Sequence, residues 1–127
     1  MTGEVARDAT QDDDGLLSER LVREARRALA ARRALTGRLP PAFVPDPALD
    51  FLKALYVAHT AEARGMSRRE LGATTAVVAN VAARWLGALR AENLIVEQAD
   101  EIHLSAHGLR MVEDGIKAVI LASQDYQ

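Results

Sequence analysis

The chain has 127 residues, of which 49% are hydrophobic and 27% are charged, and its formal net charge is −2. These values predict one soluble domain with a modest core, mainly aliphatic because aromatic residues make up 4% of the chain. The absence of cysteine excludes disulfides, thiolate zinc sites and cysteine nucleophiles. No apolar run approaches the roughly 20 residues that span a bilayer, and the N-terminus lacks the order of a secretory signal. We therefore expect no membrane association and a cytoplasmic location.

Charge is strongly segregated along the chain. Residues 1–15 hold five acidic side chains against one arginine, residues 16–40 hold seven arginines against two glutamates, and residues 41–127 hold eleven acidic against eight basic side chains. These three segments carry −4, +5 and −3. We expect residues 1–15 to be a disordered acidic tail. Residues 16–40 are predicted to form an arginine-rich helix and a linker.

Two helices are predicted before residue 65. The first covers 16–35, where leucine and alanine recur at helical spacing, and Gly37 with the following prolines stops it. The second begins at Asp46, an N-cap, with Pro47 in the first helical turn. It is expected to end near residue 63.

The next segment carries a sharply marked helix start. Ser67 and Glu70 have the spacing of a capping box, which predicts a short helix, and Thr74-Thr75 is predicted to form a turn. A longer helix then covers 76–92. Its apolar face is predicted to contain Val78, Val81, Ala82, Trp85, Leu86 and Leu89.

A hairpin and a last helix complete the predicted order. Strands at 94–96 and 102–104 are joined by a turn at 99–101, and Ser105 caps a final helix that runs to about residue 122. The apolar stripe of that helix is predicted to contain Leu109, Val112, Ile116, Val119 and Ile120. The fold class is mainly α with a small β-hairpin and about five helices. Residues 41–127 have the element order of a winged helix-turn-helix domain, which usually reads duplex DNA.

Four stretches are informative together: Arg32-Arg33 followed by residues 43–52, residues 83–89 with Arg84-Trp85 in the recognition helix, residues 92–95, and residues 104–108. They resemble the MarR-type winged-helix regulators, above all a compact alpha-proteobacterial set with an arginine-rich N-terminal helix. The resemblance implies a homodimeric transcription regulator that binds double-stranded DNA. The 76–92 helix would lie in the major groove, and the hairpin, as the wing, would touch the backbone or the minor groove.

Two departures from the family pattern concern the wing and the turn before it. Family wings carry arginine, whereas residues 97–101 contain three acidic side chains and no basic one. Phosphate repels such a wing, so it cannot make the usual contact. Asn93 stands where glycine is expected, a milder change because asparagine tolerates a left-handed backbone.

Five residues are predicted to contact DNA. Asn80 and Arg84 lie on the exposed face of the recognition helix, where asparagine can pair with adenine and arginine with guanine or phosphate. Arg68 and Arg69 begin the preceding helix, which usually crosses the sugar-phosphate backbone. Thr75, in the expected turn, is included with them.

A possible accessory basic surface comprises Arg23, Arg26, Arg27 and Arg33. It has four interpretations, which the sequence leaves open. The arginines contact DNA that flanks the site, bind an acidic protein partner, bind the tail residues 12–14 in an autoinhibitory contact, or cover the core with their stems while remaining solvated.

The sequence contains no phosphate-binding glycine loop, nucleophile elbow or paired acid–base arrangement, so we expect no enzymatic activity and no cofactor. His59, His103 and His107 lack the spacing of metal ligands. Trp85 is expected to belong to the core. Two functions remain open, a dimeric DNA-binding regulator and a winged-helix protein–protein module, and the expected dimer seam combines the helices at 16–35 and 105–122.

Overall fold

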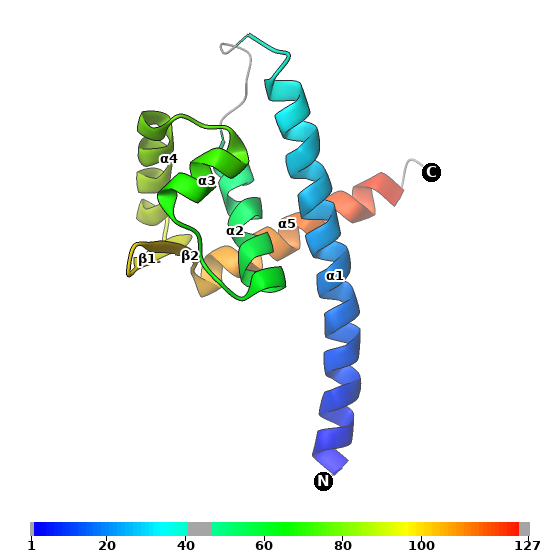
Figure 1. The fold of residues 1–127 in the computed structure, drawn as a ribbon. Coiled ribbons are helices and arrows are strands. Elements are labelled where there is room, and N and C mark those ends of the chain that lie inside the picture. The colour runs from blue at the N-terminus through cyan, green and yellow to red at the C-terminus, as the bar shows by residue number, and fades with distance from the viewer. Residues whose placement is uncertain (1, 41–46, 125–127) are drawn as a thin grey trace.

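The computed structural model describes residues 2–40 and 47–124, with side-chain surroundings from Gly15 onward. Within these residues, five helices and one antiparallel hairpin follow one another in the order of a winged helix-turn-helix (Figure 1). The predicted fold class is therefore confirmed. The elements are α1 Thr2–Thr36, α2 Ala48–Glu62, α3 Arg68–Thr75, α4 Ala79–Ala91, β1 Ile95–Gln98, β2 Glu101–Leu104 and α5 Ala106–Gln124. None of the described helices is long and apolar enough to cross a bilayer.

Helix α1 starts far earlier than the sequence analysis predicts. Its backbone is helical from Thr2, whereas a tail was expected up to residue 15, and its first half projects from the rest of the fold (Figure 1). Residues 2–15 contain no proline, so the backbone has no obligatory break there. Since residues 12–14 continue the same helix as the arginines, the autoinhibitory fold-back, one of the four interpretations left open, is not the observed arrangement. The helix ends before Gly37, as predicted.

The start of α2 lies one residue from its predicted position. Asp46 lies outside the described residues, and Pro47 occupies the N-cap position, where its carbonyl accepts a hydrogen bond from the Phe51 N–H at 2.9 Å. The helix ends at Glu62, and Ala63 adopts a left-handed conformation with φ 53°.

The capping box of α3 is confirmed. Ser67 Oγ accepts from the Glu70 N–H at 3.1 Å, and the Glu70 carboxylate accepts from the Ser67 N–H at 3.2 Å. The predicted turn at Thr74-Thr75 is wrong, because both residues are helical. The left-handed residue that ends α3 is Ala76 instead. Helix α4 consequently begins at Ala79 rather than at residue 76. Val78, predicted to be in the core, occupies the N-cap position and is 65% exposed.

The hairpin has a tighter turn than predicted. Ile95 pairs with Leu104 and Gln98 with Glu101, so only Ala99 and Asp100 form the turn. Both have positive φ, 51° and 66°, as a two-residue hairpin of the favoured twist requires.

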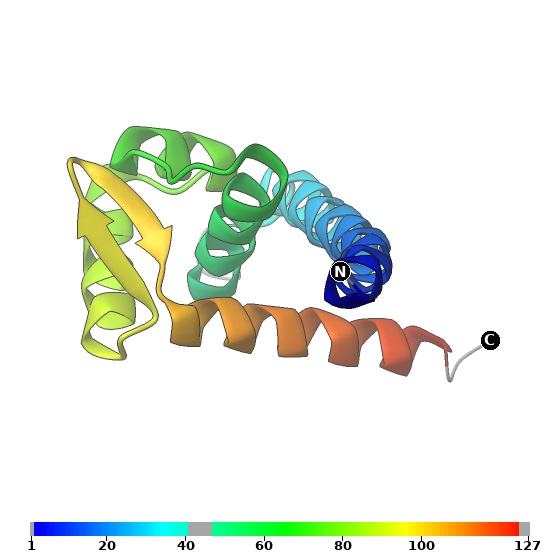
Figure 2. The same cartoon turned by 90° about the horizontal axis from the view of Figure 1, so that it is seen from below.

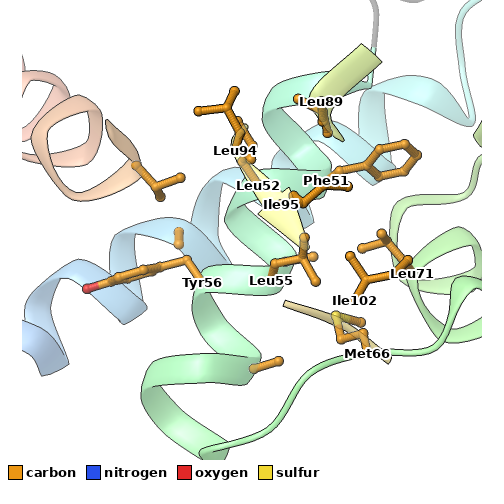
Figure 3. Packing of buried hydrophobic residues seen from close by; sticks show 14 of the residues in the cluster. Phe51, Leu52, Leu55, Tyr56, Met66, Leu71, Leu89, Leu94, Ile95 and Ile102 are labelled. Atoms are coloured by element: carbon orange, nitrogen blue, oxygen red, sulfur yellow. The ribbon is translucent and has the colours of Figure 1, made fainter. Parts of the chain in front are cut away.

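Helix α2 occupies the centre of the molecule and packs against α1, α3, β2 and α5 (Figure 2). The largest buried side chains gather around it (Figure 3). Those labelled there are Phe51, Leu52, Leu55, Tyr56, Met66, Leu71, Leu89, Leu94, Ile95 and Ile102. Each fully buried side chain of this size contributes about 1.5–3 kcal/mol of transfer free energy.

The apolar stripes of α1 and α5 are used partly within the chain itself. Leu21 of α1 and Val112 and Ile116 of α5 are buried in the core. Their predicted place in a dimer seam is therefore wrong for these three residues. Val119, from the same predicted stripe, remains 47% exposed.

One ion pair ties α1 to α2 beneath the surface. Arg32 Nε lies 3.1 Å from Asp50 Oδ2, and their side chains are 22% and 9% exposed. Removing one partner would leave the other as a poorly solvated charge, which is strongly unfavourable.

The hairpin is joined to α5 by a close backbone contact. Ser105 Oγ donates to the Asn93 carbonyl at 2.6 Å and accepts from the Gly108 N–H at 2.9 Å. A Cβ atom at position 108 would lie 2.0 Å from the Leu94 carbonyl oxygen, so only glycine fits there. Asn93 has φ 60°, the left-handed conformation expected from its replacement of glycine.

Candidate nucleic-acid interface

Helix α4 presents one polar, open face. Its opposite side is anchored by Ala82, Leu86 and Leu89, which are buried, as predicted. Asn80 and Arg84 are exposed and stand four residues apart, so they share one face of the helix. Neither makes a side-chain hydrogen bond or ion pair within the part of the chain that the structure describes. Their donors and acceptors are therefore available to a ligand.

Trp85 lies beside this face without joining it. Its ring is half-buried and packs against the core cluster, as the sequence predicts. The anchored side of α4 thus fixes the rotation of the helix, and that rotation sets which residues face outward.

The two arginines at the start of α3 have different surroundings. Arg69 is exposed and makes no ion pair with any residue in the described ranges. Arg68 instead donates from Nη2 to Glu97 Oε1 of the hairpin at 2.8 Å. Of the two arginines predicted to contact phosphate, Arg69 is thus unpaired within the described residues, whereas Arg68 is already hydrogen-bonded to the wing.

A second arginine joins the same carboxylate. Arg90, in the last turn of α4, also donates from Nη2 to Glu97 Oε1. The Arg68 hydrogen bond, followed by the charges of Arg68 and Arg90, lowers the pKa of Glu97. The carboxylate is therefore ionised at neutral pH, and it neutralises part of the positive charge at this end of the molecule.

Arg64 is held in a similar way by acidic neighbours. Its guanidinium lies 3.0 Å from Glu70 Oε2 and 3.2 Å from Glu62 Oε2. The Ser67 backbone N–H is the main cause of the lowered pKa of Glu70, and Arg64 adds to it. These contacts stabilise the loop between α2 and α3, and they place little unpaired charge on the surface.

Thr75 does not belong to the exposed surface. Its side chain is buried, and Oγ1 donates to the Leu71 carbonyl at 2.7 Å within α3. The prediction that Thr75 contacts DNA is therefore not supported, because the residue ends a helix instead of standing in an open turn.

The accessory arginines of α1 surround open depressions on the face toward the end of α2. Arg23 and Arg26 line one of about 590 Å³ together with Thr60. Arg26 and Arg33 line another of about 310 Å³. Arg27 pairs with Glu24 at 2.7 Å along the helix, and it lines a third depression together with Arg23. The four predicted arginines thus line neighbouring depressions, and Arg27 among them is partly neutralised.

The histidines are not assembled into a cluster. His103 Nε2 lies 3.5 Å from Glu101 Oε1, a contact that is an ion pair only when the imidazole is protonated. Within residues 2–40 and 47–124 the structure contains no group of three or more metal-ligating side chains.

Sequence reasoning missed Arg90 and Glu97 as members of this surface. Arg90 is not among the residues predicted to contact DNA, and Glu97 was considered only as one of the acidic wing residues that repel phosphate. The sequence does place an arginine at the start of one helix, an arginine at the end of the next helix and a glutamate in the strand that follows. No local spacing reveals that these three side chains meet in the fold.

No protein-family model matches the chain, and no curated protein matches it. Among solved structures, the chain is similar to a protein from Pseudomonas aeruginosa PA01 that is described provisionally as a transcriptional regulator. The two share 18% sequence identity over 98% of this chain and 82% of the other, with a TM-score of 0.44. A likeness at this level assigns neither a family nor a function, and the fold assignment rests on the element order described above.

Proposed function

We propose that this chain is a cytoplasmic DNA-binding transcription regulator of the MarR-like winged-helix type. It acts as a homodimer and directs α4 toward the major groove. The observation that carries the proposal is the open face of α4, where Asn80 and Arg84 are exposed and have no partner within the described residues. These side chains can pair bidentately with adenine and guanine, and each such pair discriminates by about 1–3 kcal/mol.

Arg69 supports the same surface from the neighbouring helix. It stands in the first turn of α3, where a positive charge is mildly unfavourable because of the helix dipole. An exposed arginine at this place is well suited to a phosphate of the DNA backbone. Base contact by α4 and phosphate contact by α3 are the usual roles of the two helices in this fold.

A homodimer is supported by apolar surface that the single chain leaves uncovered. A groove of about 140 Å³ lies between α1, α2 and α5, with Leu49, Met111 and Val119 among its lining residues. These three side chains are 55%, 45% and 47% exposed. A second copy that covers them would gain about 25 cal/mol per Å² of apolar surface buried. The second copy would also present a second α4, so that the dimer could bind two half-sites on the DNA.

Binding of a fluorescent random-sequence duplex across a salt series tests this function. With about three phosphate contacts in each half of a dimer, the log–log slope against salt should be about −5. Arg69→Ala and Arg84→Ala should each weaken binding, whereas Lys117→Ala, which removes a charge from α5, should leave it unchanged. Binding that is absent at low salt, or flat against salt, would refute the proposal.

The second candidate function is a winged-helix module that binds an acidic protein and no DNA. The observation in its favour is the exposed arginine surface of α1, where Arg23, Arg26 and Arg33 make no ion pair within the described residues. Arg26→Glu combined with Arg33→Glu should then abolish co-purification of the partner. A complex that survives this reversal would exclude the α1 surface.

A further inference from the structure

Two arginines from different helices converge on one oxygen atom of the wing. Arg68 begins α3, Arg90 ends α4, and both donate through Nη2 to Glu97 Oε1 in β1. The three side chains are 52%, 48% and 32% exposed. This contact is therefore open to solvent.

The geometry matches what guanidinium groups do with phosphate. Arginine binds carboxylate and phosphate oxygens through the same charge-assisted hydrogen bonds, and its donors are satisfied equally well by either. Two guanidiniums and one carboxylate leave a formal charge of +1 on the cluster. A phosphate oxygen that took the place of Glu97 Oε1 would meet both donors at once.

We propose that Arg68 and Arg90 form a phosphate subsite of the DNA-binding surface, and that Glu97 occupies this subsite in the absence of DNA as an internal competitor. The inference rests on the proposed DNA-binding function and specifies how that surface is regulated. A DNA phosphate is thus the proposed ligand of Arg90, and the acidic wing acts by competing with that phosphate rather than by repulsion alone.

The competition has a defined energetic scale. Exposed ion pairs of this kind are weak, because water and salt screen them and long side chains lose freedom in forming them. DNA can therefore displace the carboxylate, but each protomer must break two hydrogen bonds to do so. The effect is to reduce the affinity for DNA and the number of counterions released on binding, without abolishing either.

Glu97→Gln in the full chain tests the inference, with Glu101→Gln as its matched control. Both substitutions remove one negative charge from the same hairpin, but Glu101 contacts His103 rather than an arginine. The probe is the fluorescent random-sequence duplex across a salt series. Glu97→Gln should tighten binding roughly fivefold or more at about 0.1 M salt and steepen the salt slope by about 1–2, whereas Glu101→Gln should change both much less.

Arg90→Gln completes the test as a double-mutant cycle. This substitution should weaken binding more in the Glu97→Gln background than in the wild type, because Glu97 partly neutralises Arg90 in the latter. Circular dichroism confirms that each variant is folded before its affinity is compared. Differences in DNA affinity between folded variants then reflect the phosphate subsite and not the stability of the domain.

Each outcome decides the inference. Tighter binding by Glu97→Gln alone, relative to a wild type that binds the duplex at low salt, supports it. Equal affinity of the wild type, Glu97→Gln and Glu101→Gln overturns the subsite while leaving DNA binding in place. An equal gain in both glutamine variants also overturns it, because general repulsion would then be sufficient. Absence of binding by the wild type and by both glutamine variants overturns the inference and the proposed function together.

Discussion

The helix-turn-helix end of the molecule and the α1 end carry arginines in opposite surroundings. Arg68 and Arg90 share the carboxylate of Glu97, whereas Arg23 and Arg26 line an open depression and make no ion pair within the described residues. Within the described residues, Arg69 and Arg84 are thus the arginines that stay open on the expected DNA-binding surface, whereas Arg23 and Arg26 stay unpaired in α1. Counting charges along a chain shows where they are, but the folded contacts decide which of them a partner can use.

The two ends also differ in how they are held. The helix-turn-helix is fixed by local backbone devices, namely the capping box at Ser67, the left-handed Ala76 and the close contact at Gly108. Helix α1 is held by its buried stripe and by the Arg32–Asp50 pair, and apolar side chains remain exposed beside it. The first region is held mainly by local contacts, and the second leaves exposed the apolar surface that the proposed dimer would cover.

Paired substitutions in α5 separate core from interface and have the largest expected effect. Ile116→Asp places a charge where the side chain is 3% exposed. The free energy of unfolding should therefore fall by about 4–5 kcal/mol, the range of the most damaging core changes, and the domain should fail to fold. Val119→Asp should fold but remain a monomer, as judged by circular dichroism and light scattering. A soluble dimer from Val119→Asp would remove the α1–α5 seam from consideration.

Gly108→Ala tests the join between the hairpin and α5. Because its Cβ would lie 2.0 Å from the Leu94 carbonyl oxygen, the free energy of unfolding should fall by about 3 kcal/mol. Gly87→Ala is the control, since nothing lies within 4 Å of a Cβ there, and it should raise the stability of α4 by up to about 1 kcal/mol. Urea unfolding measures both, and similar values for the two variants would contradict the close contact.

Arg32→Ala and Arg33→Ala compare neighbouring arginines of α1. Arg32 pairs with the buried Asp50, so its loss should cost about 2–4 kcal/mol of unfolding free energy. Arg33 is exposed, and its substitution should change stability by about 0.5 kcal/mol or less. Equal costs in chemical denaturation would mean that the ion pair does not hold α1 to α2.

Ser67→Ala tests the local device that starts α3 and has the smallest expected effect. Loss of the cap should cost about 1 kcal/mol. The acid response belongs to Glu70, because its pKa is lowered from the ordinary value of 4.5 mainly by the Ser67 backbone N–H, which Ser67→Ala keeps; Glu70→Gln is the variant that removes this response. A carboxylate whose pKa is lowered in the folded state stabilises the protein fully above its ordinary pKa. This contribution disappears as the pH falls through the lower pKa of the folded state.

Thermal unfolding between about pH 6 and pH 3 measures this difference. The wild type should lose stability more steeply than Glu70→Gln below the ordinary glutamate pKa, because the variant has no carboxylate to protonate. Parallel curves for the two proteins would show that the capping box makes no contribution to the acid response.

The sequence predicted the order of elements well, because helix starts, periodic apolar faces and short strands are local signals. The capping box at Ser67 and the stop at Gly37 were located correctly for that reason. The turn after α3 was not, since an alanine adopts the left-handed conformation there and no glycine or asparagine marks it. The early start of α1 was also missed, because an acidic composition does not by itself break a helix.

The candidate surface was only partly predictable. Asn80, Arg84 and Arg69 follow from helix faces and helix ends, and all three are exposed as expected. The contact between Arg68 and Glu97 joins residues 29 apart in the chain, and the contact between Arg90 and Glu97 crosses from α4 to β1. Such pairs depend on tertiary packing, and no sequence period encodes them.

The most direct test of the central claim is to map where duplex DNA contacts the full chain, by amide NMR of the labelled protein with and without DNA. The account predicts the largest shift changes in the first turns of α4, around Asn80, and at the start of α3, with smaller changes in residues 16–36 of α1. Shift changes confined to α1, or none at DNA concentrations that saturate binding, would contradict it.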